Sequence, residues 1–185
     1  SLALADINND GIKEIFYGDD QYGDFYCYDL QAEALLWTIP VNVDDYSSLA
    51  IEDFDNDGNL EVFWGSGCST SGPDNLYCYQ ITNQALEWKS QYFEGPYYSI
   101  KVVDVDEDGT SEILVLADES FSGLELSIYD AVSKDLEFRS NNGAITANLG
   151  LRNMEIFDYQ HDGDLDILIF TGDGAKGSFF ILDGN

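Results

Sequence analysis

The sequence is short of basic residues, cysteine and long apolar runs, and each shortage excludes a class of protein. The 185 residues include 7 Lys and Arg against 36 Asp and Glu, which gives a formal net charge of −29. A chain with so few cations does not bind nucleic acid through its phosphates, nor does it dock on an anionic membrane surface. No run of about 18 apolar residues is present, so we expect no membrane insertion. The 3 cysteines are too few for a disulfide framework.

Apolar and aromatic residues are nevertheless plentiful enough to build a core. Hydrophobic residues make up 44% of the chain, with 12 Tyr, 11 Phe and 3 Trp, so the acidic composition does not indicate disorder. The 17 Gly and only 3 Pro suit many tight turns between short strands. We therefore expect a folded all-β protein whose negative charge is offset by a bound partner or cation.

An acidic segment recurs four times and organises the sequence. The copies begin at residues 6, 53, 104 and 158, roughly 50 residues apart. Each has the pattern Asp-x-Asp/Asn/Gln-x-Asp-Gly-x-x-Glu/Asp and is followed by an apolar run such as Ile113–Leu116. Four short strands for every 50 residues or so is the period of a propeller blade. The sequence predicts β-propeller blades, each a four-stranded antiparallel unit with an acidic loop between its first and second strands.

The repeats divide the chain into units of approximately residues 1–44, 45–95, 96–147 and 148–185. The first three units contain four strand-like runs, and the last contains three. Because an incomplete sheet leaves an unpaired edge, we expect an arc of a larger propeller, completed by further blades of a longer protein or by a neighbouring subunit. A self-contained four-bladed ring is the alternative. The sequence opens without Met or a leader pattern, so we interpret it as part of a longer chain.

The acidic loops have the chemistry of a calcium site. Calcium takes six to eight oxygen ligands, and alternate side chains on a tight loop can converge on one point. Positions 1, 3, 5 and 9 would supply side-chain oxygens and position 7 a backbone carbonyl, while Gly at position 6 allows the chain to turn back. The predicted ligands are Asp6, Asn8, Asp10, Ile12 and Glu14 in the first loop; Asp53, Asp55, Asp57, Asn59 and Glu61 in the second; Asp104, Asp106, Asp108, Thr110 and Glu112 in the third; and Asp158, Gln160, Asp162, Asp164 and Asp166 in the fourth.

Electrostatic repulsion favours a cation over the alternative of merely solvated turns. The second and third loops each hold four ligand carboxylates, and the first and fourth each hold three. Two like charges 4 Å apart repel by about 4 kcal/mol at an effective dielectric constant of 20. We therefore expect up to four Ca²⁺ ions, bound most tightly in the second and third loops. An EF-hand is excluded because its closing position 12 holds apolar strand residues here, such as Trp64 and Val115.

The acidic loop and the apolar strand after it recur together every 50 residues or so. This pattern resembles the FG-GAP/VCBS repeats of calcium-binding β-propellers. Integrin α-subunit heads carry similar loops. The literal Phe-Gly and Gly-Ala-Pro signatures are absent, and the fourth loop has Gln160 and Asp166 at positions 3 and 9. The resemblance implies an extracellular or cell-surface recognition or adhesion module with a protein or glycan ligand. Two alternatives stay open, namely a structural subunit that packs against neighbouring subunits in a surface assembly or filament, and a carbohydrate-active propeller enzyme.

No catalytic constellation stands out from the sequence. His161 is the only histidine and occupies position 4 of the fourth loop, where we expect it to face solvent. A Ser/His/Asp or Cys/His site therefore cannot be assembled.

Repeat position also indicates the roles of the cysteines and of three aromatic residues. Cys27 and Cys78 occupy the same place in successive units and are expected to be free core thiols, with a Cys68–Cys78 disulfide as the alternative. A separate repeat position holds Trp37, Trp88 and Phe138, which we expect in the core between blades.

Overall fold

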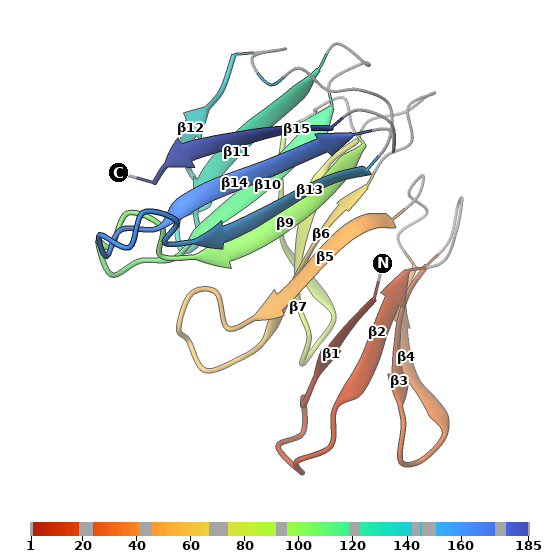
Figure 1. The fold of residues 1–185 in the computed structure, drawn as a ribbon. Coiled ribbons are helices and arrows are strands. Elements are labelled where there is room, and N and C mark those ends of the chain that lie inside the picture. Colours follow the sequence, from red (N-terminus) through yellow and green to blue (C-terminus); the bar gives the residue numbers. More distant parts are fainter. Residues whose placement is uncertain are drawn as a thin grey trace. The chain divides into compact units, whose positions relative to one another are not determined.

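The computed structural model describes residues 2–18, 24–40, 46–66, 74–91, 96–118, 123–141, 145, 151–172 and 177–184. These residues contain fifteen strands in four antiparallel sheets (Figure 1). None of the described residues belongs to a helix long and apolar enough to cross a bilayer.

Each sheet is a meander in which consecutive strands pair in chain order. The first sheet contains β1 (Leu2–Ala5), β2 (Glu14–Gly18), β3 (Phe25–Asp29) and β4 (Ala34–Ile39); the second contains β5 (Tyr46–Glu52), β6 (Glu61–Ser66), β7 (Leu76–Gln80) and β8 (Ala85–Lys89); the third contains β9 (Tyr97–Val103), β10 (Glu112–Asp118), β11 (Leu124–Asp130) and β12 (Leu136–Arg139); the fourth contains β13 (Leu151–Phe157), β14 (Asp166–Gly172) and β15 (Gly177–Asp183). The all-β prediction is confirmed, and so is the position of each acidic loop between the first two strands of its sheet.

The second strand of a sheet is apolar at successive positions because it is buried on both faces, as β6 shows. Every residue of β6 is buried, including Val62, Phe63 and Trp64. A strand that is covered on both faces has no solvent side, so its sequence does not alternate between apolar and polar residues. β15 differs, because exposed and half-buried residues alternate along its whole length.

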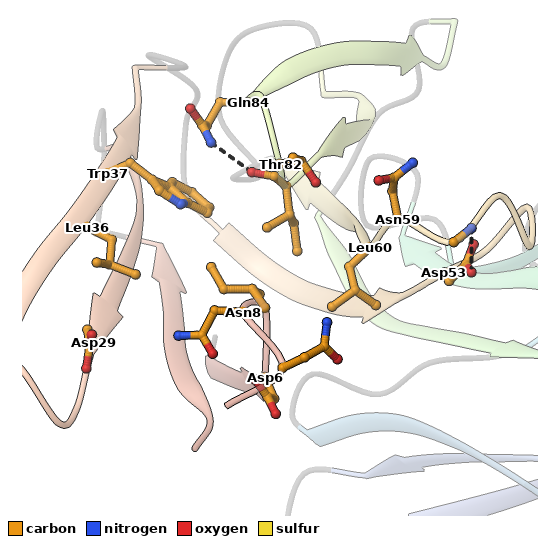
Figure 2. A pocket seen from close by; sticks show the side chains of 14 residues that line it. Asp6, Asn8, Asp29, Leu36, Trp37, Asp53, Asn59, Leu60, Thr82 and Gln84 are labelled. Atoms are coloured by element: carbon orange, nitrogen blue, oxygen red, sulfur yellow. Dashed lines mark hydrogen bonds between the residues drawn. The ribbon is translucent and has the colours of Figure 1, made fainter. Parts of the chain in front are cut away.

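The chain forms two compact units, Ser1–Pro96 and Tyr97–Asn185, each holding two sheets. In the first unit, the core joins Phe16 and Phe25 of the first sheet to Trp64 and Tyr77 of the second. The rings of Phe25 and Trp64 stack with centroids 5.0 Å apart. Residues of both sheets also line a cavity of about 720 Å³, shown in Figure 2.

The second unit has a core of aliphatic side chains between its two sheets. This core contains Leu114, Leu116 and Leu126 of the third sheet and Met154 and Ile169 of the fourth. The core side chains of the two sheets face each other, as in neighbouring blades of a radial array.

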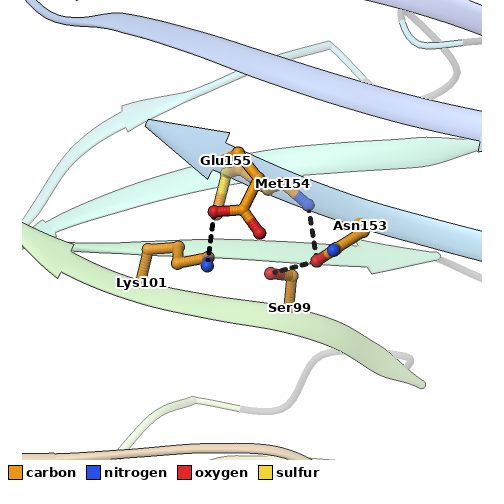
Figure 3. Close-up of polar contacts among 5 residues, drawn as sticks. All are labelled: Ser99, Lys101, Asn153, Met154 and Glu155. Carbon is orange, nitrogen blue, oxygen red and sulfur yellow. Dashed lines mark hydrogen bonds and ion pairs between the residues drawn. The ribbon is translucent and has the colours of Figure 1, made fainter. Parts of the chain in front are cut away.

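Polar contacts align β9 with β13 in the second unit (Figure 3). Lys101 Nζ lies 2.9 Å from Glu155 Oε2, and Ser99 Oγ donates a hydrogen bond to Asn153 Oδ1 at 3.4 Å. The ion pair is partly exposed to solvent, with side chains 34% and 58% accessible, so we expect it to add less than about 1 kcal/mol. The two contacts link the first strand of the third sheet to the first strand of the fourth sheet.

The prediction that three equivalent aromatic residues fill the core is wrong for one of them. Trp37 packs against Phe16 with ring centroids 5.8 Å apart, and Trp88 lies 5.9 Å from Phe63. Phe138, by contrast, is 48% exposed. In the first unit, the cavity that Trp37 lines is also lined by the buried residue Ile81, which directly follows β7. In the second unit, a pocket is lined by Phe138, and the residue that directly follows β15 there is Gly184. Because glycine has no side chain, Phe138 has less to pack against.

Cys27 and Cys78 are both buried, as expected, and form no disulfide within the described part of the chain. Cys68 lies outside the described residues.

Candidate metal-binding loops

The four acidic loops, residues 6–14, 53–61, 104–112 and 158–166, share one backbone conformation. Position 6 is left-handed in every copy, with φ between 87° and 104° at Gly11, Gly58, Gly109 and Gly163. A Cβ added to any of these glycines would meet no atom within 4 Å, so the backbone angle and not crowding requires glycine. Position 4 is left-handed too, at Asn9, Asn56, Glu107 and His161. His161 is exposed, as predicted.

The carboxylate at position 1 holds the glycine turn in place. Its Oδ2 atom accepts a hydrogen bond from the glycine N–H at distances between 2.9 and 3.1 Å. The four donor–acceptor pairs are Gly11–Asp6, Gly58–Asp53, Gly109–Asp104 and Gly163–Asp158. The second oxygen of this carboxylate, Oδ1, accepts the backbone N–H of position 5 in the first, second and fourth loops at 3.0 to 3.2 Å.

The position-5 carboxylate accepts the backbone N–H of position 7. These bonds measure 2.8 Å in the first three loops and 3.2 Å in the fourth. Position 7 therefore contributes through its backbone, which is why it can hold Ile12, Asn59, Thr110 or Asp164.

The acid at position 9 has a role that sequence analysis missed. Its side chain accepts the backbone N–H of position 2, at 2.7 to 3.0 Å, and thereby closes the loop onto the second strand. All four of these acids are at most 3% exposed, namely Glu14, Glu61, Glu112 and Asp166. The available signal was an acid directly before each apolar run, at the first residue of β2, β6, β10 and β14.

The third loop brings all four of its acidic side chains together. One oxygen from each of Asp104, Asp106, Asp108 and Glu112 lies within 4.8 Å of the others. Asp104 Oδ1 is buried and has no hydrogen-bond partner among the described residues. A buried oxygen without a partner costs free energy, and more so when the group is charged. These carboxylate oxygens are therefore the kind of ligands that a hard cation takes.

Burial and charge act together on the position-9 acid of this loop. The pKa of Glu112 is raised to about 7, chiefly by burial and further by the charges of Asp106, Glu137 and Asp104, against the lowering effect of the Val105 N–H. The negative charges of Asp106, Glu137 and Asp104 thus act on a Glu112 carboxyl group that is buried from solvent.

The second loop is similar but gathers three carboxylates. Asp53, Asp55 and Glu61 offer oxygens within 4.8 Å of one another, whereas Asp57 lies outside this group. Burial, followed by the charges of Asp55, Glu87 and Asp57, raises the pKa of Glu61 to about 7. In the first and fourth loops, all of whose residues are described, the acidic side chains form no such group. The structure thus groups the carboxylates most closely in the two loops that carry four of them.

The first and second loops open onto one cavity. Figure 2 shows Asp6 and Asn8 of the first loop and Asp53 and Asn59 of the second around this space, with Trp37 on the opposite side. Gln84 also lines it, and its Nε2 donates a hydrogen bond to Ile81 O at 2.8 Å. The cavity therefore combines an indole, carboxylates and amides.

Comparison with known proteins shows what one segment and the fold of the chain are similar to. The model of the FG-GAP-like repeat matches residues 53–115, the segment that holds the second and third loops. The whole chain superposes on two solved propeller-type structures. One is Saccharomyces cerevisiae Sqt1, with a TM-score of 0.69 and 12% identity over 99% of this chain and 44% of Sqt1. The other is the Dos1 propeller, with a TM-score of 0.61 and 8% identity over 100% of this chain and 45% of that one.

The chain is a β-propeller with an FG-GAP-like repeat. At such low identity the two solved structures show the fold alone, and the chain spans less than half of the length of either. No curated protein sequence matches it. The family match coincides with the two loops in which carboxylates gather within 4.8 Å.

Proposed function

We propose that the acidic loops bind Ca²⁺ and that this FG-GAP-like propeller is a calcium-stabilised recognition or adhesion module outside the cell. Calcium binding rests on the third loop, where four carboxylates converge and Asp104 Oδ1 is buried without a hydrogen-bond partner in the described part of the chain. A divalent cation would offset the repulsion between these groups and satisfy the orphaned oxygen.

The location of the module follows from the affinity expected of such loops. Calcium sites with dissociation constants of about 10⁻⁴ to 10⁻³ M are typical of extracellular modules. Four ions would reduce the formal charge of −29 to about −21, which still favours solubility. The affinity range supports a role in the extracellular medium or at the cell surface.

The cavity in the first unit is the binding place we propose for a protein or glycan ligand. Its volume of about 720 Å³ lies within the usual range of about 300–1,000 Å³ for ligand sites. Trp37 offers a flat apolar surface, and Asn8, Asn59 and Gln84 offer amide groups around it. Aromatic surfaces with a polar surround suit both sugars and protein side chains.

The substitution Asp104→Asn tests the calcium site because its effect should change sign with calcium. The variant loses one negative charge but retains its size and an oxygen for the Gly109 N–H. In chelator it should melt above the parent protein, since one repulsive charge is gone. In 1 mM Ca²⁺ it should melt below the parent, since one anionic ligand is lost. A shift of about 2–4 °C for each kcal/mol is expected for a chain of this size.

Asp164→Asn is the matched control. It also removes one charge from an acidic loop, but at position 7, where the backbone and not the side chain is the predicted ligand. Its melting temperature should stay close to that of the parent in both media. If Asp104→Asn shifts the melting temperature in the same direction with and without calcium, the cation site is refuted.

A further inference from the structure

The cavity of the first unit is lined by acidic and amide side chains, and its described lining holds no lysine or arginine (Figure 2). The three carboxylates belong to Asp6, Asp29 and Asp53. The formal charge of the whole chain is −29, so the field around the cavity is negative as well. An anionic ligand, such as a phosphate, a sulfated sugar or a sugar acid, would meet repulsion there and no opposite charge. The lining therefore disfavours acidic ligands.

The same carboxylates give a cationic ligand little to bind. Both oxygens of Asp6 accept backbone N–H groups of the first loop, and both oxygens of Asp53 accept those of the second, at 2.9 to 3.2 Å. These two residues are also among the ligands that we propose for Ca²⁺, whose charge would offset theirs. Asp29 lies outside the loops, and its Oδ1 accepts two N–H groups of its own turn. With calcium bound, the cavity thus favours a ligand without a net charge.

Three amide side chains of the cavity each form a hydrogen bond with the protein at one end only. The Oδ1 atom of Asn8 accepts a backbone N–H at 2.9 Å, while Asn59 Nδ2 and Gln84 Nε2 donate at 2.9 and 2.8 Å. These bonds identify the oxygen end of each amide. The other ends are one donor, Asn8 Nδ2, and two acceptors, Asn59 Oδ1 and Gln84 Oε1, none of which bonds to a described residue. A ligand hydroxyl group can bond to each of them because it both donates and accepts, whereas an ammonium or guanidinium group only donates.

Trp37 gives the cavity a flat apolar surface in a fixed orientation. Its ring packs against Phe16 and Phe25 of the same sheet, with centroids 5.8 and 6.3 Å apart. Figure 2 shows the indole across the cavity from Asn59. A sugar ring has an apolar face of C–H groups and an edge of hydroxyl groups, so it can stack on an indole while its hydroxyl groups meet amides.

The corresponding pocket of the second unit shows that the amides are a feature of this cavity and not of the fold. That pocket, of about 350 Å³, is lined by Phe138 and by acids that include Asp106, Glu137 and Asp183, with no amide among its described lining residues. Asp106 occupies position 3 of its loop, where the first loop has Asn8. The amide at position 3 removes one carboxylate from the first loop and supplies the hydrogen-bond donor of the cavity.

We propose that the cavity of the first unit binds a neutral oligosaccharide, with one sugar ring stacked on Trp37 and its hydroxyl groups bonded to Asn8, Asn59 and Gln84. This inference rests on the proposed role of the cavity as the ligand site and narrows that ligand to an uncharged glycan. Because the first and second loops carry Asn8 and Asn59, calcium that holds these loops also holds two of the sugar contacts in place. The affinity for the glycan should therefore fall in chelator.

An array of immobilised probes tests the class of ligand with the full chain in saturating Ca²⁺. The probes are neutral oligosaccharides of glucose, galactose, mannose, xylose and N-acetylglucosamine, sialylated and uronic-acid oligosaccharides, and peptides rich in lysine or arginine. At least one neutral oligosaccharide should retain the protein, and EDTA should weaken this retention. The proposal is overturned if no neutral oligosaccharide retains the protein, or if acidic oligosaccharides or the peptides retain it more tightly.

The substitution Asn8→Asp separates sugar binding from calcium binding, because the two affinities should change in opposite directions. It keeps the oxygen that accepts the backbone N–H but removes the Nδ2 donor, so the affinity for the retained neutral oligosaccharide should fall about 3- to 10-fold. It also gives the first loop a fourth carboxylate, so that loop should bind Ca²⁺ more tightly. Calorimetric titration with each ligand measures both affinities.

Asn56→Asp is the matched control for this substitution. Asn56 is exposed in the second loop and is not among the residues that line the cavity. The same chemical change should therefore leave the affinity for the oligosaccharide unchanged. Equal losses of this affinity in Asn8→Asp and Asn56→Asp would overturn the proposal.

Trp37→Leu and Trp88→Leu form a second pair that tests whether the sugar lies in the cavity. Trp88 holds the same repeat position in the second sheet but is not among the residues that line the cavity. In saturating calcium, with folding checked by near-UV circular dichroism, Trp37→Leu should abolish retention by the neutral oligosaccharide and Trp88→Leu should preserve it. Retention that survives Trp37→Leu would overturn both this proposal and the role of the cavity. Retention by a peptide alone, abolished by Trp37→Leu, would overturn the neutral sugar and leave the cavity as the ligand site.

Discussion

The position-9 acids show how single residues connect each loop to its sheet. Glu61 and Glu112 are 1% and 2% exposed, and each ties the start of its loop to the start of the second strand through one backbone hydrogen bond. Burying an acid is costly unless its oxygens find partners. The loop and the strand therefore depend on each other, and an ion that binds the loop would stabilise the sheet edge as well.

The buried Cys27 thiol should be unreactive in the folded protein. Burial, with smaller contributions from the charges of Glu14 and Asp29, raises the pKa of Cys27 from 9.0 to about 12. Because the thiolate is the reactive form, Cys27 should react very slowly with Ellman's reagent at pH 8 in the native protein. Stability linked to this thiol should be complete below about pH 9 and decline as the pH rises toward 12, because the folded state disfavours the thiolate.

A Cys68→Ser background removes the cysteine outside the described residues from this measurement. Cys27 and Cys78 should then both react once guanidinium unfolds the chain. Rapid labelling of either thiol in the native protein would show that the core around it is not closed.

Aromatic residues at the same repeat position of two strands, Trp37 on β4 and Phe138 on β12, should contribute differently to the free energy of unfolding. Trp37 packs against the core of the first unit, whereas Phe138 is 48% exposed on β12, whose four residues are all exposed. Trp37→Ala should therefore lower the free energy of unfolding by about 2–4 kcal/mol, and Phe138→Ala by less than about 1 kcal/mol. Urea denaturation of the two variants in saturating calcium measures the difference. Equal losses would mean that Phe138 is buried in solution.

The strands and loops could be predicted from the sequence because their signals are local. The recurrence of Asp, Gly and Glu at fixed spacing indicated the loops, and the apolar runs after them indicated the second strands. The exposure of Phe138 could not be predicted, because it depends on Gly184 of another sheet where the first unit has Ile81. The hydrogen bond from each position-9 acid to the backbone N–H of position 2 could not be predicted either, because it depends on the burial of that acid in the folded sheet.

For the whole molecule, repeat counting predicted three four-stranded sheets and one three-stranded sheet, and the described residues confirm them. Counting did not predict that the chain divides into two compact units, because the contacts between successive sheets depend on which side chains meet. Within each unit, core residues of both sheets pack together. A cation bound at one loop should therefore stabilise the neighbouring sheet of the same unit as well as its own.

Thermal unfolding with and without calcium measures whether the acidic loops bind Ca²⁺ in the folded protein. After removal of divalent ions with EDTA, the melting temperature should fall, and addition of 1 mM free Ca²⁺ should restore it, because ligand binding to the native state alone adds to its stability. The same concentration of Mg²⁺ should restore much less, since its small ion demands stricter octahedral geometry. Superimposable melting curves in EDTA and in Ca²⁺ would show that Ca²⁺ does not stabilise the folded protein.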